Sequence, residues 1–190
     1  MRNLLLILLL LCTSCIQIGD APPPMNYYLL ESLTELPTAS SENSSNIHLE
    51  LKSFPEYLDR LQIVTYNGSN GINFKDNERW AEPVQDNLMR VVRENLAKSI
   101  PGSVISIGPW ENSTNNAVKI ELVFNQFSGQ LGKHTKIDIR WAIVKGSGES
   151  KQGYFTDQQP IGDKYQDLII GLNNGINHFS LELAKNLTTE

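Results

Sequence analysis

Two stretches of the chain alternate apolar and polar side chains, and they limit the possible folds more than any other feature. Successive side chains of a β-strand point to opposite faces, so such alternation predicts strands with one buried face. The apolar positions are Val118, Ile120, Leu122 and Phe124 in the first stretch, and Ile137, Ile139, Trp141 and Ile143 in the second. Short glycine-containing connections at 128–129 and 146–148 predict an antiparallel meander, with a third strand around 153–155.

Two other segments repeat their apolar residues at helical spacing. Pro83 stands at the expected start of the first helix, which should end near Ser99 because Pro101 and Gly102 follow. The apolar positions are Val84, Leu88, Val91, Val92 and Leu96 in the first helix, and Tyr165, Leu168, Ile169, Leu172, Ile176, Phe179, Leu183 and Leu187 in the last. Two main helices packed on a mostly antiparallel sheet define the predicted fold class, an α+β two-layer sandwich.

Gly171 and Gly175 flank the apolar stripe of the last helix. Each glycine costs a helix about 1 kcal/mol relative to alanine, so a compensating contact is expected. Close approach of the helix backbone to the sheet is the favoured interpretation. A small-residue face for helix dimerisation is the alternative.

Shorter extended segments precede the first helix. They are predicted at 27–30, 47–51, 61–66 and 72–74, with a further strand at 104–107 after the helix. Residues 34–46 are polar and lack an apolar period, which indicates a loop. We expect one periplasmic α+β domain over residues 26–190.

The N-terminus has the order of a secretion signal. Arg2 is followed by an apolar run at 4–11, and small residues at 13 and 14 precede Cys15. The segment 12–15 resembles a bacterial lipobox, although Cys12 replaces the usual leucine. We therefore predict a signal peptide over 1–14 and a lipidated Cys15. An ordinary cleaved signal with a leftover cysteine is the alternative.

Residues 15–25 are predicted to be a lipidated tether, because the proline run 22–24 keeps this segment extended. Both cysteines of the chain lie at the N-terminus, so the body cannot form an internal disulfide. By resemblance to lipoproteins generally, the absence of Asp after Cys15 suggests sorting to the outer membrane.

The net charge limits the partners. The chain carries a formal charge of −5, and removal of Arg2 with the signal leaves about −6. No basic footprint for nucleic acid is present, and attraction to anionic lipid through basic residues is absent too. Membrane attachment should therefore depend on the acyl chains of Cys15.

Candidate catalytic groups are few. His48, His134 and His178 have no other histidine or cysteine at ligand spacing, so we expect no metal site. No phosphate-binding loop and no nucleophile elbow occurs, and we expect no cofactor. These observations favour a binding or scaffolding protein over an enzyme.

A charged segment with a tryptophan, 76–83, directly precedes the first helix. Trp80 is interpreted first as an apolar residue packing on the helix that it precedes. The alternative is that Arg79 and Trp80 anchor a partner, because these residue types are common at interface hot spots. Tyr27 and Tyr28 join them as tentative partner-binding residues, since an edge strand can pair with another chain.

These residues also carry a family resemblance. The segments 27–30, 55–64 and 79–83, followed by the helix, Pro101-Gly102, the meander and the last helix, resemble the ABC-type transport auxiliary lipoproteins. Within this family the PqiC-type intermembrane transport lipoproteins are the most similar. The resemblance covers nearly all of the chain after the tether.

The resemblance implies a function that the residues alone do not show. It implies a periplasm-facing lipoprotein of the Gram-negative outer membrane that serves an MCE-type intermembrane lipid transport system and supports envelope integrity. It implies an MCE-domain partner, and we expect a homo-oligomer. The alternatives are a secreted lipoprotein hydrolase of envelope components, or an assembly lipoprotein unrelated to lipid transport.

Overall fold

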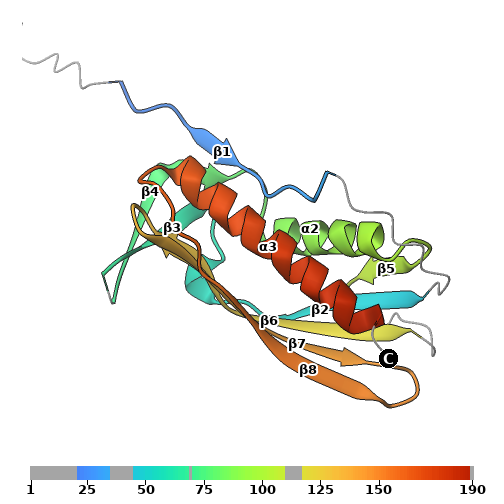
Figure 1. Ribbon diagram of the computed structural model, residues 1–190. Coiled ribbons are helices and arrows are strands. Elements are labelled where there is room, and N and C mark those ends of the chain that lie inside the picture. Colours follow the sequence, from blue (N-terminus) through green and yellow to red (C-terminus); the bar gives the residue numbers. More distant parts are fainter. Residues whose placement is uncertain (1–20, 35–44, 69, 110–116, 189–190) are drawn as a thin grey trace, which may run out of the picture.

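The computed structural model describes residues 21–34, 45–68, 70–109 and 117–188 of the chain (Figure 1). The predicted signal peptide, Cys15 and the first part of the tether lie outside these residues, as does most of the polar stretch 34–46. Two long helices lie on one side of a twisted sheet. The predicted α+β two-layer sandwich with two main helices is confirmed.

In the described part of the chain, four strands precede the first long helix, and four more lie between it and the second. The strands are β1 Asn26–Tyr28, β2 Asn46–Ser53, β3 Gln62–Asn67, β4 Gly71–Trp80, β5 Val104–Ile107, β6 Val118–Gln130, β7 His134–Val144 and β8 Ser150–Asp157. The helices are a short 3-10 turn η1, Glu56–Leu58, and the long helices α2, Val84–Ser99, and α3, Tyr165–Thr188.

Strand β6 is the centre of the eight-stranded sheet. One of its edges pairs with β7 in an antiparallel ladder from Lys119 to Gln130, and β8 continues this meander as predicted. Its other edge is divided between β2, which pairs near the start of β6, and β3, which pairs at Gly129. Strand β5 lies outside β2, whereas β4 and then β1 lie outside β3.

The sheet is therefore mixed. Most registered residue pairs are antiparallel, in β6–β7, β7–β8 and β3–β4. Strands β2 and β3 run parallel to β6, β5 parallel to β2, and β1 parallel to β4. The alternation of apolar residues predicts that a segment is a strand, but it does not identify a parallel partner far away in the sequence.

Helix α2 has the predicted extent, and Pro83 occupies the cap position immediately before its first residue. Gly102 follows the helix with φ of 86°, a backbone conformation that glycine adopts without strain. The apolar stripe of α2 is buried at Val84, Leu88, Val91, Val92 and Leu96.

Helix α3 crosses the sheet closely at its two glycines. A Cβ atom added to Gly175 would lie 2.4 Å from Ile137 Cδ1, and one added to Gly171 would lie 2.7 Å from Thr135 Cγ2. Both glycines are buried against β7. The interpretation as close backbone approach is confirmed, and a helix-dimer face is excluded because the sheet already covers these positions.

Candidate partner-binding site at the N-terminal edge strand

Strand β1 forms one edge of the sheet. It pairs only with β4 among the described strands, and this parallel ladder places Tyr27 opposite Arg79 and Tyr28 opposite Trp80. The amide of Ala81 donates a 2.9 Å hydrogen bond to the Tyr28 carbonyl and extends the pairing. The sequence-based expectation that this segment is an edge strand is confirmed by this pairing.

A nearly buried carboxylate fixes the inward side of β1. Glu78, which is 8% exposed, accepts hydrogen bonds from Asn26 Nδ2 at 3.0 Å and from the Tyr28 hydroxyl at 2.7 Å. Burial, followed by this bond to Glu78, raises the pKa of Tyr28 to about 12. Asn26 and Tyr28 therefore lie on the same face of the sheet as Glu78, and their neighbours in the chain lie on the opposite, outward face.

The outward side chains of this segment are apolar and accessible. Tyr27 is 62% exposed, Leu29 is 46% exposed and Met25 is 43% exposed. Because side chains alternate along an extended chain, these three lie on the same face. Tyr27 is thus available for contact with another molecule.

Arg79 and Trp80 occupy different environments. Arg79 is half-buried, and its Nε donates a 2.6 Å hydrogen bond to the Asp76 carbonyl. Trp80 is only 5% exposed and stacks on Phe127 with ring centroids 6.3 Å apart. The alternative in which Trp80 anchors a partner directly is therefore wrong for this structure, and its interpretation as a packing residue stands.

The chain immediately after β1 is bound to both helices by asparagine side chains. Asn87 of α2 accepts from the Leu30 amide at 2.7 Å and donates to the Leu30 carbonyl at 3.3 Å. Two further asparagines, Asn173 and Asn95, accept from the amides of Glu31 at 2.7 Å and Leu33 at 2.8 Å. We call residues 21–34 the N-terminal arm, and Asn87, Asn95 and Asn173 the asparagine clasp.

The clasp is supported from within the helix layer. Asn87 and Asn95 are fully buried, and Asn95 Nδ2 donates to Asn177 Oδ1 at 2.8 Å and to Ser180 Oγ at 3.3 Å. Buried amides need partners to offset their desolvation, and here the arm and α3 provide them. These residues are absent from the sequence-based predictions, because helical periodicity shows that a polar residue is buried but not which backbone it binds.

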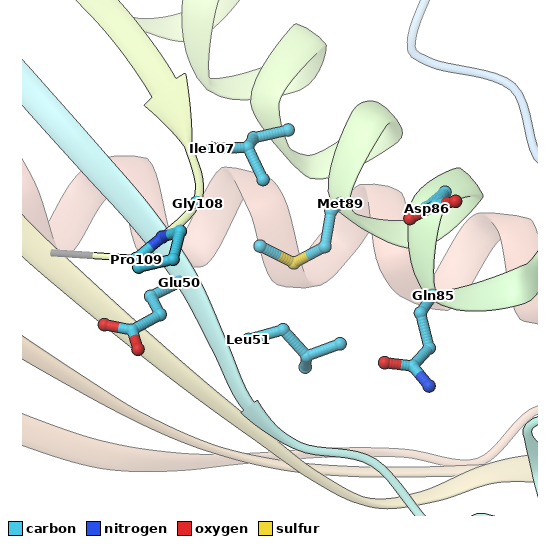
Figure 2. Close-up of a pocket in the computed structure, with 8 residues that line it drawn as sticks. All are labelled: Glu50, Leu51, Gln85, Asp86, Met89, Ile107, Gly108 and Pro109. Atoms are coloured by element: carbon cyan, nitrogen blue, oxygen red, sulfur yellow. The ribbon is translucent and has the colours of Figure 1, made fainter. Parts of the chain in front are cut away.

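A concave region, separate from the edge strand, lies between β2, α2 and the end of β5. This groove has a volume of about 420 Å³ and is lined by Glu50, Leu51, Gln85, Asp86, Met89, Ile107, Gly108 and Pro109. Figure 2 shows Leu51, Met89 and Ile107 converging on it, with the carboxylates of Glu50 and Asp86 toward opposite ends. Its residues do not include the predicted partner-binding residues.

Glu50 belongs to an ion-pair network on the sheet. Lys52 Nζ lies 2.9 Å from Glu50 Oε1, and Lys119 Nζ lies 3.4 Å from Glu50 Oε2 and 2.7 Å from Glu121 Oε1. The hydrogen bond from Lys52, with a smaller effect from the charge of Lys119, lowers the pKa of Glu50 against the opposing effect of burial. Glu50 is thus held ionised by partners in the sheet.

The three histidines lie in separate places. His48 is buried in β2, with Nδ1 3.0 Å from Ser106 Oγ and Nε2 2.5 Å from the Gly108 carbonyl. His134 begins β7, and His178 lies on α3 with Nδ1 3.9 Å from Asp157 Oδ1. Within the described ranges no three metal-ligating side chains are grouped.

Among the described residues, no helix has the length and apolar character to cross a bilayer.

The fold is similar to that of known structures. A crystal structure of an uncharacterised protein has a TM-score of 0.74 at 18% identity, covering 87% of this chain and all of that one. Protein XCC0632 from Xanthomonas campestris has a TM-score of 0.66 at 14% identity, covering 84% and 92% of the two chains. At these identities the two structures show that the chain shares their fold, the α+β two-layer sandwich.

The family follows from the sequence match. Residues 28–184 match the family described as ABC-type transport auxiliary lipoprotein component, and the chain belongs to that family. The predicted resemblance is confirmed at this level. Among curated proteins, no sequence matches. The matched range begins at Tyr28, the last residue of β1, and ends within α3, so it includes the chain after the edge strand, α2 and most of α3 but not Asn26 and Tyr27.

Proposed function

We propose that this chain is a membrane-anchored auxiliary lipoprotein of an MCE-type intermembrane lipid transport system, similar to the PqiC-type members of its family. The observation that carries the proposal is the family match over residues 28–184, because this family is an auxiliary component of ABC-type transport. The protein then acts by binding partners and thereby supports envelope integrity.

The proposed processing follows the chain order. Residues 1–14 are removed as a signal peptide, Cys15 receives acyl chains, and residues 15–25 tether one periplasmic domain over 26–190 to the outer membrane of a Gram-negative bacterium. Two or three acyl chains anchor a protein stably, whereas a single chain is marginal. With acyl chains as the anchor, the body needs no membrane-spanning helix.

The proposed partner surface is the free backbone edge of β1, with Arg79 beside it. An edge strand presents unpaired main-chain groups, which suit strand addition by an MCE-domain protein or by another copy of this chain. Tyr27 and Tyr28 provide the strand itself. Trp80 contributes beneath this surface, by fixing the end of β4 to the core.

Lipid attachment is tested by Cys15→Ala in cells fed labelled palmitate. The variant should lose the label and leave the membrane fraction. Persistence of both would show that Cys15 is not the anchor. Sequencing the neighbouring genes gives an independent check, because an adjacent MCE-domain gene supports the transport assignment.

Partner binding is tested in detergent, where no bilayer is present. The lipidated protein is titrated against the MCE-domain protein encoded beside it, and its oligomeric state is measured by light scattering. Arg79→Ala should weaken binding by about 2 kcal/mol if Arg79 is an interface anchor. Arg93→Ala is the matched control, because Arg93 lies on α2 and pairs with Glu94, whereas Arg79 lies on β4 opposite β1. Equal binding by both variants would rule out the Arg79 surface.

A further inference from the structure

The N-terminal arm has two properties that are unusual for a surface in contact with water only: a row of exposed apolar side chains and an uncharged stretch of chain that contains this row. Its outward row, Met25, Tyr27 and Leu29, is apolar and exposed at every position. No charged residue lies between Asp20 and Glu31, although the mature chain carries about −6. Lone exposed apolar residues are common, but three consecutive outward positions in an uncharged segment mark a contact surface.

The outward direction of this row is built into the fold. Glu78 holds Asn26 and Tyr28 inward, and Leu30, which is fully buried, continues the same inward side. The asparagine clasp then fixes the backbone of residues 30–33 against α2 and α3. The row cannot turn into the core unless these bonds break. It must therefore be covered from outside or stay in water.

We infer that the row Met25, Tyr27 and Leu29 lies on the lipid surface of the membrane that holds Cys15. This inference rests on the proposed lipidation. The occupant is the interfacial region of a phospholipid bilayer, where the amphipathic ring of tyrosine is favoured and leucine and methionine reach the acyl boundary.

Chain length supports this occupant. Met25 is ten positions after Cys15, so the start of the row stays within roughly 33 to 36 Å of the anchor even when the chain is fully extended, and Leu29 follows only four positions later. A surface tethered at such short range meets the bilayer at a high effective concentration, and weak apolar contacts then suffice to orient the body.

The charge of the protein limits which lipid headgroups this row can contact. The arm offers no basic residue, and the net-negative body is repelled by an anionic surface. The contact therefore depends on apolar burial and favours zwitterionic headgroups. The free backbone edge of β1 lies in the sheet plane, whereas strand side chains stand perpendicular to it, so strand addition leaves the row accessible; Arg79, opposite Tyr27, borders both surfaces.

The test places a fluorophore in the row of the full lipidated chain. Tyr27→Trp protein is reconstituted into phosphatidylcholine vesicles that carry bromine atoms close to the headgroup end of the acyl chains. The matched control is Tyr154→Trp, because Tyr154 is also exposed, at 74%, but lies on β8. Wild-type protein gives the signal of the native tryptophans.

The inference predicts a blue-shifted emission for Tyr27→Trp and quenching by brominated lipid beyond that of wild type and of Tyr154→Trp. Adding Met25→Ser and Leu29→Ser should reduce the quenching while the melting temperature stays unchanged. Emission from Tyr27→Trp that is not quenched, in protein that remains bound to the vesicles, overturns the inference. A blue shift without quenching does so in favour of a protein contact. Failure of the protein to stay with the vesicles refutes the lipid anchor instead.

Discussion

Replacing Trp80 by alanine tests whether this residue belongs to the core or to an interface. Trp80 is 5% exposed, stacks on Phe127, and lines a small internal space together with Phe54, Leu58 and Val84. Its backbone is held by a 2.8 Å hydrogen bond to the Leu61 carbonyl and by pairing with β1. The backbone therefore has little freedom to collapse into the cavity that the substitution creates.

The expected cost follows from this environment. Loss of a buried tryptophan destabilises proteins by roughly 3 to 5 kcal/mol, and poor collapse favours the upper part of that range. For a chain of this length, such a loss lowers the melting temperature by about 6 to 20 °C. Association with a partner should be unchanged at temperatures where both proteins remain folded.

Urea unfolding followed by circular dichroism measures the free energy of unfolding, and titration against the partner measures association. Tyr27→Ala is the control for stability, since the 62% exposed Tyr27 should cost less than about 0.5 kcal/mol. A loss of stability below about 1 kcal/mol in Trp80→Ala, combined with weaker association by about 2 kcal/mol or more, would refute the core assignment.

Three further predictions concern the helix contact, the buried tyrosine and the clasp. Gly175→Ala should destabilise the fold by up to about 2 kcal/mol, because overpacking of about 1 to 3 kcal/mol is only partly offset by a gain of about 1 kcal/mol in helix propensity; the exposed Asn174→Ala should not destabilise the fold in thermal unfolding. The Tyr28 hydroxyl stabilises the fold as a neutral donor, so its contribution is complete below its ordinary pKa of 10.0 and is lost as pH rises to about 12; the difference in stability between wild type and Tyr28→Phe should shrink over this interval, and a constant difference in urea titrations would contradict the bond. Asn87→Ala should leave the Leu30 amide unpaired, while the Leu30 carbonyl keeps its bond from Arg90; it should cost about 1 to 3 kcal/mol and speed hydrogen exchange at that amide, and unchanged exchange would argue against the clasp.

Local elements of this fold could be predicted from the sequence, because their signals are local. The alternation around Ile120 and Ile139 predicts β6 and β7, and helical spacing predicts α2 and α3. The close approach at Gly175 was also predictable, since a glycine beside an apolar helix stripe needs a reason to be there. Each of these predictions depends on residues that are neighbours in the chain.

The arrangement of the strands and the surroundings of the site could not be predicted in the same way. The sequence indicates a strand only at 72–74, whereas β4 extends from Gly71 to Trp80. Its register with β3 shifts between Gln62 and Val64, and its end pairs with the distant β1. The split edge of β6 and the partners of Asn87 depend likewise on tertiary contacts. The position of Trp80 before α2 favours packing as the first interpretation, but its stacking on Phe127 of β6 could not be predicted from that position.

The asparagine clasp also affects how the arm can evolve. Asn87, Asn95 and Asn173 bind main-chain amides, which every residue except proline provides. Sequence drift at positions 31–33 therefore leaves the attachment intact, and only a proline at 30, 31 or 33 would remove a bonded N–H group. Homologues can thus exchange the surface chemistry of this segment without rebuilding the body beneath it.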